Sequence, residues 1–99
     1  MAEIELAGGV LKVSGDLRSA DREEFAQAVD ALLESSEENL TVDLTEVDFL
    51  LSVFVSQIVR FCQMATEEGK DHQVLVGPSL REIFESTGLA GELPVKFVG

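Results

Sequence analysis

Apolar residues recur with two different periods along the chain, and the period indicates the type of each element. Short apolar or alternating runs bounded by turn residues predict strands at residues 4–6, 10–14, 40–44 and 73–76. Apolar residues spaced by three and four positions predict a helix that includes residues 25–33 and a longer one that starts near residue 52. A third helix is expected at residues 79–88, and residues 95–98 form either a closing strand or an extended tail.

Residues that favour turns and helix ends separate these elements. The Gly-Asp pair at residues 15–16 is expected to end the second strand. Ser19 or Asp21 is expected to cap the first helix by accepting hydrogen bonds from its free N–H groups. Ser79 and Glu82 match a capping box at the start of the third helix, in which each side chain bonds to the backbone of the other residue.

The order of the elements predicts one α/β domain over residues 1–99. Two strands come first, and helices and strands then alternate, which is typical of a sheet that is mostly parallel in its second half. We therefore expect a small mixed sheet of about four to five strands flanked by about three to four helices. A chain of 99 residues is large enough to bury one core without a disulfide or a metal.

The junction between the strand at residues 40–44 and the following helix is the most informative segment. Backbone N–H groups and side chains converge at such junctions, which therefore often carry function. Residues 49–55 read Phe-Leu-Leu-Ser-Val-Phe-Val, so Ser52 is the only polar residue among them. This composition indicates a contact surface rather than a chemical site.

The helix after this junction has an unusually wide apolar stripe. Its apolar residues span roughly 160° of the helix circumference, whereas a surface helix needs only about 100°. The excess either contacts a neighbouring helix as well as the sheet, or forms a docking face for another protein. The residues concerned are Phe54, Val55, Ile58, Val59, Phe61, Cys62 and Ala65.

Charge and targeting signals narrow the class of partner and the location. The chain has 19 acidic and 7 basic residues and a net charge of −12, so its surface repels nucleic acid and attracts a basic partner. Acidity that serves only solubility is an equally good explanation. No apolar segment is long enough to span a membrane, and the N-terminus lacks the pattern of a signal peptide. We therefore expect a cytoplasmic protein without membrane insertion.

Few residues in the sequence offer chemistry. Cys62 lies within the apolar stripe and is expected to be a small core residue, and a single cysteine forms no internal disulfide. The only histidine, His72, has no second histidine or free cysteine with which to bind a metal. The sequence contains no motif for nucleotide binding or nucleophilic catalysis. We therefore expect neither an enzyme nor a bound cofactor or metal.

Three segments of the chain coincide in order and spacing: residues 13–17 (VSGDL), residues 42–50 (VDLTEVDFL) and the pattern Leu80…Thr87-Gly88-Leu89. Together they resemble the STAS domain, the fold of bacterial anti-sigma factor antagonists. The resemblance extends from Ile4 to Val95. It implies a small sheet flanked by helices, and a domain that takes part in the regulation of transcription by binding a partner protein.

The resemblance also implies a phosphorylation switch at the junction. In the antagonist family this segment reads aspartate, a hydroxyl residue, a second hydroxyl residue and glycine, and a partner kinase phosphorylates the second hydroxyl residue. Carried over without gaps, these four positions hold Leu51, Ser52, Val53 and Phe54. Valine has no hydroxyl group, so we expect the switch to be absent at that position.

Ser52 is the one hydroxyl residue that this motif retains. As a phospho-acceptor it would place the phosphate at a helix N-terminus, where free N–H groups favour an anion. It lies one residue before the usual acceptor, however, which on a helix is a rotation of about 100°. The alternative is that Ser52 caps the helix and accepts a hydrogen bond from the N–H group of Phe54 or Val55.

These observations lead to three hypotheses about binding. The first is docking to an anti-sigma factor or a related regulatory kinase through Leu51, Ser52, Val53, Ser56, Gln57 and Arg60. The second is a STAS subunit of a lipid-transporting ABC complex, which contacts the ATPase or the permease, or a part of a stress-sensing scaffold. The third is a homodimer formed through an exposed apolar patch of Leu51, Val53 and Phe54.

Overall fold

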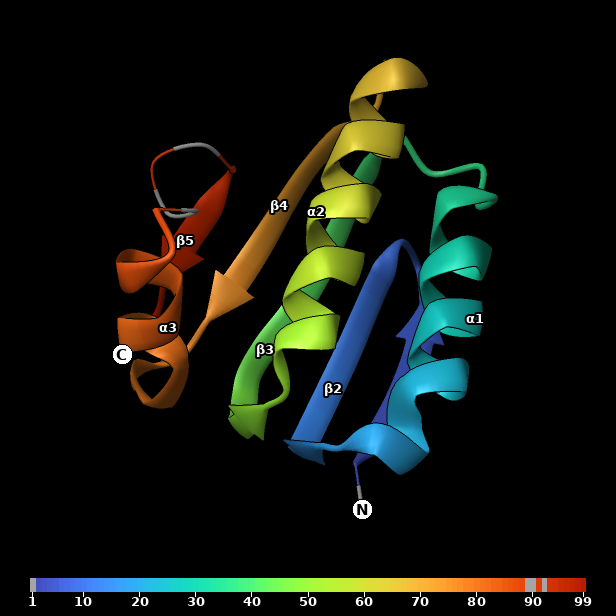
Figure 1. Cartoon of the computed structure of the whole chain (residues 1–99). Coiled ribbons are helices and arrows are strands. Elements are labelled where there is room, and N and C mark those ends of the chain that lie inside the picture. The colour runs from blue at the N-terminus through green and yellow to red at the C-terminus, as the bar shows by residue number, and fades with distance from the viewer. Residues whose placement is uncertain (1, 89–90, 92) are drawn as a thin grey trace.

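The computed structural model describes residues 2–88, 91 and 93–99, which form one five-stranded sheet with three α-helices (Figure 1). The strands are β1 (Glu3–Ala7), β2 (Val10–Leu17), β3 (Asn39–Leu50), β4 (Asp71–Val76) and β5 (Val95–Phe97). The helices are α1 (Arg22–Leu33), α2 (Ser52–Glu67) and α3 (Arg81–Ser86), and short 3-10 turns precede α1 at Ser19–Asp21 and α3 at Pro78–Leu80. This architecture confirms the predicted fold class. Leu89, which belongs to the third segment of the family resemblance, lies outside the described residues.

The five strands lie in the sheet in the order of the sequence, with β1 antiparallel to β2 and all other neighbours parallel. The register aligns the apolar residues, since Leu11 pairs with Val42 and Val42 with Val74, and all three are fully buried. Residues between them along each strand point to the opposite face. Figure 1 shows α1 and α2 in front of the sheet and α3 beside β5. The buried residues of the strands and helices form one cluster, so the core lies in one layer between the helices and the sheet.

The prediction that residues 15–16 end the second strand is wrong. β2 continues to Leu17, and β3 is paired with it as far as Leu50. The register shifts twice along this pairing, and Gly15, at one of the shifts, has a φ of 89° that suits glycine. These irregularities allow both strands to continue to the junction at which α1 and α2 begin.

Both predicted helix caps are wrong, because a 3-10 turn precedes each helix. The carboxylate of Asp21 accepts a hydrogen bond from the backbone N of Arg18, 3.0 Å away, and so closes the turn before α1. Ser79 lies inside the turn before α3, and its hydroxyl donates to a carboxylate oxygen of Asp48 at 3.4 Å. Neither α1 nor α3 begins with a side-chain cap.

The two long helices are held together at both ends. Near the start of α2, the rings of Phe25 and Phe54 meet edge to face with centroids 5.4 Å apart, and both side chains are fully buried. At the other end, the ammonium group of Lys70 donates to the carbonyl oxygens of Leu33 and Ser35, at 3.2 and 2.5 Å, and so caps the C-terminus of α1. These contacts fix the position of α1 relative to α2.

Gly77 follows β4 and approaches β3 so closely that no side chain fits. A Cβ atom at this position would lie 2.7 Å from the carbonyl oxygen of Thr45, a backbone atom that has no freedom to rotate away. We expect Gly77→Ala to lower the free energy of unfolding by about 1–3 kcal/mol, because the chain must shift to relieve the contact. Urea denaturation of the two proteins measures this difference.

Gly91→Ala is the matched control, because a Cβ atom at Gly91 meets no atom of the described residues within 4 Å. We expect this substitution to change the free energy of unfolding by less than about 0.5 kcal/mol. Equal losses for the two variants would show that close packing against Thr45 is not the reason for glycine at position 77.

Candidate functional site

β2 and β3 both end where α2 begins, and Leu51 connects these elements. Its backbone is extended, with φ −75° and ψ 154°, and its N–H group donates to the carbonyl oxygen of Leu17 at 3.2 Å. Ser52 is the first helical residue and is exposed. The N–H group of Phe54 donates to the carbonyl oxygen of Leu51 at 3.0 Å, so a backbone oxygen takes the role predicted for the hydroxyl. The prediction that Ser52 caps this helix is wrong.

Phe54 points into the core rather than to solvent. Its exposed fraction is 0%, whereas Leu51 and Val53 are half-buried. Consecutive residues on a helix are separated by about 100°, so positions 53 and 54 do not share a face. The sequence left open whether Phe54 is exposed, and its burial removes the largest member of the apolar patch on which the homodimer hypothesis depends.

The other residues predicted to dock a partner lie together on one side of α2. Spacings of three and four residues place them in adjacent rows along the exposed side of the helix, next to α1. At the far end, Arg60 forms an exposed ion pair with Asp30 of α1, with 3.2 Å between nitrogen and oxygen. We call this surface the α2 strip; it consists of Ser52, Val53, Ser56, Gln57 and Arg60.

A hollow of about 530 Å³ lies between the α2 strip and the start of α1. It is lined by Ser19, Ala20, Arg22, Glu23, Ala26 and Gln57. The side-chain oxygen of Gln57 is buried and has no hydrogen-bond partner among the described residues. A buried amide oxygen without a donor costs about 1–3 kcal/mol, so the packing of Gln57 is a local cost to the stability of the fold.

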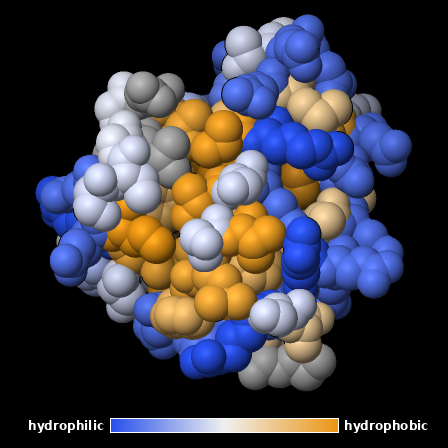
Figure 2. All heavy atoms as spheres, viewed as in Figure 1, coloured by the Kyte–Doolittle hydropathy of each residue, from blue (hydrophilic) through white to orange (hydrophobic). Residues whose placement is uncertain are grey.

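The opposite flank of α2 is apolar. Figure 2 shows apolar residues over α2 and between α2 and α3, whereas the surface of α1 is mostly polar. Val55 and Val59 lie on this flank and are half-buried, while Cys62 is buried in the core. Most of the wide apolar stripe of α2 is therefore buried in the core. Its edge, which includes Val55 and Val59, stays partly accessible to solvent.

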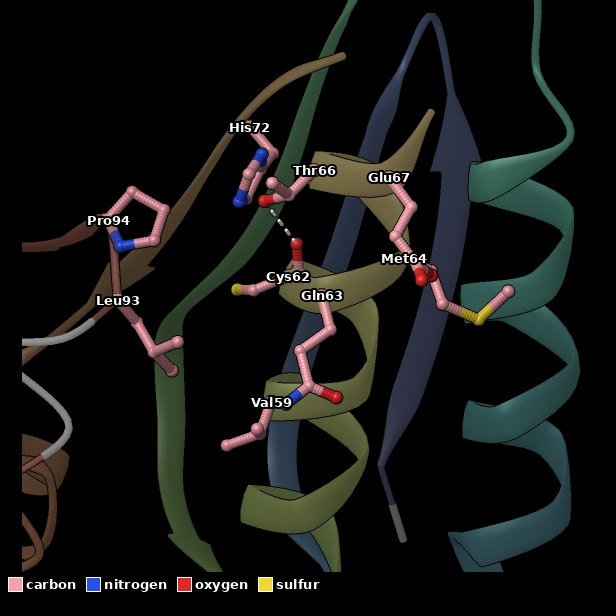
Figure 3. Close-up of a pocket in the computed structure, with 9 residues that line it drawn as sticks. All are labelled: Val59, Cys62, Gln63, Met64, Thr66, Glu67, His72, Leu93 and Pro94. Carbon is pink, nitrogen blue, oxygen red and sulfur yellow. Dashed lines mark hydrogen bonds between the residues drawn. The ribbon is translucent and has the colours of Figure 1, made fainter. Parts of the chain in front are cut away.

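A second hollow, of about 600 Å³, continues this apolar flank between α2, β4 and the segment before β5 (Figure 3). Leu93 and Pro94 face α2 across it, and His72 lies at its end near Thr66. The contribution of Leu93 and Pro94 to this hollow was not predicted. Their segment has no periodic pattern, so nothing local indicates which helix it faces.

The most reactive side chains near α2 are held in unreactive environments. Burial raises the pKa of the Cys62 thiol to about 11, so thiolate is scarce near neutral pH. Nδ1 of His72 lies 3.1 Å from the carbonyl oxygen of Lys70, and its ring packs edge-on against Phe61.

Within the described part of the chain, no group of three or more His, Cys, Asp or Glu is placed to hold a metal. Of the helices that the structure describes, none has the length and apolar character needed to cross a bilayer.

A cluster at the ends of β2 and β3 was also not predicted. The guanidinium group of Arg18 lies 4.8 Å from the centroid of the Phe49 ring and forms an ion pair with Asp16 at 3.0 Å. Phe49 is 40% exposed and pairs with Asp16 across the two strands. These residues meet only because of the shifted register between β2 and β3, for which the sequence carries no signal.

Comparison with known families matches almost the whole chain. The family model described as "Mlab, STAS domain" matches residues 1–98, which include the junction and the α2 strip. No protein with a curated description matches the chain.

Several solved structures share the fold. An anti-sigma factor antagonist from Mycobacterium paratuberculosis is 27% identical, with 96% of this chain and 83% of that chain covered and a TM-score of 0.76. The anti-sigma factor antagonist SpoIIAA in its unphosphorylated form is 13% identical, with coverage of 100% and 89% and a TM-score of 0.78. An anti-sigma-factor antagonist (STAS) domain protein from Planctomyces limnophilus is 19% identical, with coverage of 98% and 89% and a TM-score of 0.70.

The raised pKa of Cys62 predicts slow alkylation of the folded protein. At pH 8, we expect iodoacetamide to modify the folded chain at least about tenfold more slowly than the urea-unfolded chain, because only an accessible thiolate reacts. Mass spectrometry at timed intervals measures both rates. Equal rates would contradict the burial of this thiol.

The same group makes stability depend on pH in the alkaline range. The folded thiol ionises at a pKa of about 11 and an ordinary thiol at 9.0, so its contribution is fully present below pH 9.0 and is lost as the pH rises toward 11. Cys62→Ala removes this contribution, so its free energy of unfolding should fall less steeply than that of the unchanged protein over this range.

Proposed function

Because this chain belongs to the STAS domain family, we propose that it is a non-enzymatic regulatory module that binds a partner protein. The partner class is an anti-sigma factor or a related regulatory kinase, and the structural likeness to anti-sigma factor antagonists supports this class. The module would dock through Leu51 and the α2 strip. It would act in the bacterial cytoplasm and regulate transcription.

Val53 is the observation that carries this proposal. It occupies the position at which the family motif has its phospho-acceptor, and it lies half-buried in the first turn of α2. A side chain without a hydroxyl accepts no phosphate, whereas its apolar surface favours lasting contact with another apolar surface. We infer that the module binds without the usual phosphorylation switch, either as a constitutive antagonist or as a decoy that its partner does not turn over.

The surroundings of the α2 strip support docking of a protein rather than of a small molecule. The strip is bordered on one side by the hollow that Gln57 lines, and on the other by the apolar flank that includes Val55 and Val59. Apolar contact surrounded by polar groups is typical of protein interfaces. The net charge of −12 also favours a basic partner.

A second candidate function is a STAS subunit of a lipid-transporting ABC complex, in contact with its ATPase or permease. The matching family model carries the words "Mlab, STAS domain" and does not name an anti-sigma factor antagonist, so the family match does not favour the first candidate over this one. Val53 fits it equally well, because such a role needs no phosphorylation cycle. A stress-sensing scaffold is a further role in which a STAS domain without a switch would serve.

Val53→Asp should weaken binding of the partner by roughly 30-fold or more, because it brings an unpaired carboxylate into the interface at a cost of about 2 kcal/mol or more. Isothermal titration calorimetry with the purified partner measures the change in affinity. Val10→Asp makes the same chemical change on another exposed valine, 38% accessible and at the far end of β2, and should leave the affinity unchanged. Equal affinities of both variants would place the interface elsewhere.

The identity of the partner distinguishes the two candidate functions. Tagged protein is used to capture partners from host lysate with and without ATP, and mass spectrometry identifies them. Capture of a kinase-like anti-sigma factor that is retained in the presence of ATP is expected for the unswitched antagonist. Capture of a transporter ATPase or permease would contradict this function and support the ABC subunit.

Ser52 offers a separate test of the missing switch, because it is exposed at the N-terminus of α2. We expect no phosphate on the protein after incubation with the captured kinase and ATP, since the acceptor hydroxyl is displaced by one residue. Intact-mass measurement detects a single phosphate. Phosphorylation that Ser52→Ala abolishes would show that the switch has moved to position 52.

A further inference from the structure

Phe49 is the one phenylalanine that the fold leaves exposed to solvent. Of the other five phenylalanines in the chain, four are fully buried and the fifth, Phe97, is half-buried, whereas Phe49 is 40% exposed. Phe49 is the next-to-last residue of β3, and Leu50 after it is buried in the core. Successive residues of a strand face opposite sides, so the ring of Phe49 points away from the core.

The exposed ring is nevertheless held in a fixed place. The guanidinium group of Arg18 lies 4.8 Å from the ring centroid, within the range of a cation–π contact, and it is bonded to the carboxylate of Asp16 at 3.0 Å. Asp16 in turn pairs with Phe49 across the two strands. The backbone of Arg18 is held as well, because its N–H group donates to the carboxylate of Asp21, a residue that is only 2% exposed.

This Arg18–Phe49 pair lies beside the start of α2, where the ends of β2 and β3 come together (Figure 1). The N–H group of Leu51 donates to the carbonyl oxygen of Leu17 at 3.2 Å, which joins the residue before Arg18 to the second residue after Phe49. Leu51 leads directly into the α2 strip. The pair is therefore continuous with the docking surface proposed above.

A fixed aromatic ring suits the binding of a protein. A side chain that is already held in one orientation loses little conformational freedom when a partner covers it. Aromatic and arginine side chains also contribute most to the affinity of protein interfaces. A second copy of this chain, with the same net charge of −12, would be repelled, as would nucleic acid. The occupant that fits the ring is an apolar pocket on the protein that covers the α2 strip.

We propose that Phe49 is an anchor of the docking surface and enters an apolar pocket of the partner. Arg18 is a positioning residue, which holds the ring in the orientation for entry. This inference rests on the proposed function, because it assigns further contacts to the partner that binds the α2 strip. It extends the docking surface from the helix to the ends of β2 and β3.

Photocrosslinking in host lysate tests whether the partner reaches Phe49. Three variants carry p-benzoylphenylalanine in place of Phe49, of Ser56 in the α2 strip, or of Leu6. Leu6 is the control, because it is also 40% exposed but pairs with Leu11 near the start of β2, at the opposite end of the sheet. Mass spectrometry identifies the attached proteins after irradiation. We expect the same protein at positions 49 and 56 and its absence at position 6.

The other outcomes separate this inference from the proposed function. Attachment of the partner at position 56 but not at position 49 would overturn the role of Phe49 and leave the α2 strip as the docking surface. Absence of the partner at both positions would overturn the proposed function and this inference together. Equal attachment at positions 49 and 6 would show unspecific contact and would also overturn the role of Phe49.

Isothermal titration calorimetry with the protein identified in this way measures the two roles. Phe49→Ala should weaken binding by about 30-fold or more, and Leu6→Ala by less than about twofold. Arg18→Ala should weaken binding by about fivefold, and Arg18→Lys should recover most of this loss, because an ammonium group is also attracted to the face of the ring. Equal losses for Phe49→Ala and Leu6→Ala would overturn the anchor, and equal losses for the two Arg18 variants would overturn the positioning role.

Discussion

The structure depends on a one-sided burial of the sheet, in which a single apolar face is covered by the helices. Leu11, Val42 and Val74 align across three strands and bring the apolar residues of the sheet together beneath α1 and α2. A sheet of this kind must cover its apolar face and leaves the other in water. The edge-to-face contact of Phe25 with Phe54 then sets the position of the two helices where β2 and β3 end.

This packing explains the geometry of the junction. Phe54 fills the space between α2 and α1. The first turn of α2 is thereby fixed in the core, and Val53, about 100° away around the helix, is only half-buried. The first turn of α2 therefore presents an apolar side chain at its surface, and family membership alone does not determine what that surface does.

The sequence by itself determined the type and order of the helices and strands and the fold class. These properties depend on local spacing, such as the apolar steps from Phe54 to Ile58 and Phe61. Tertiary structure alone decided that β2 and β3 run on to the junction, that 3-10 turns replace the predicted caps, and that Phe54 is buried. It also decided which residues meet across strands, such as Lys12 and Glu46, whose charged groups lie 2.9 Å apart. Such contacts join residues far apart in the chain, and their register is set by strand pairing and its shifts, which leave no local pattern in the sequence.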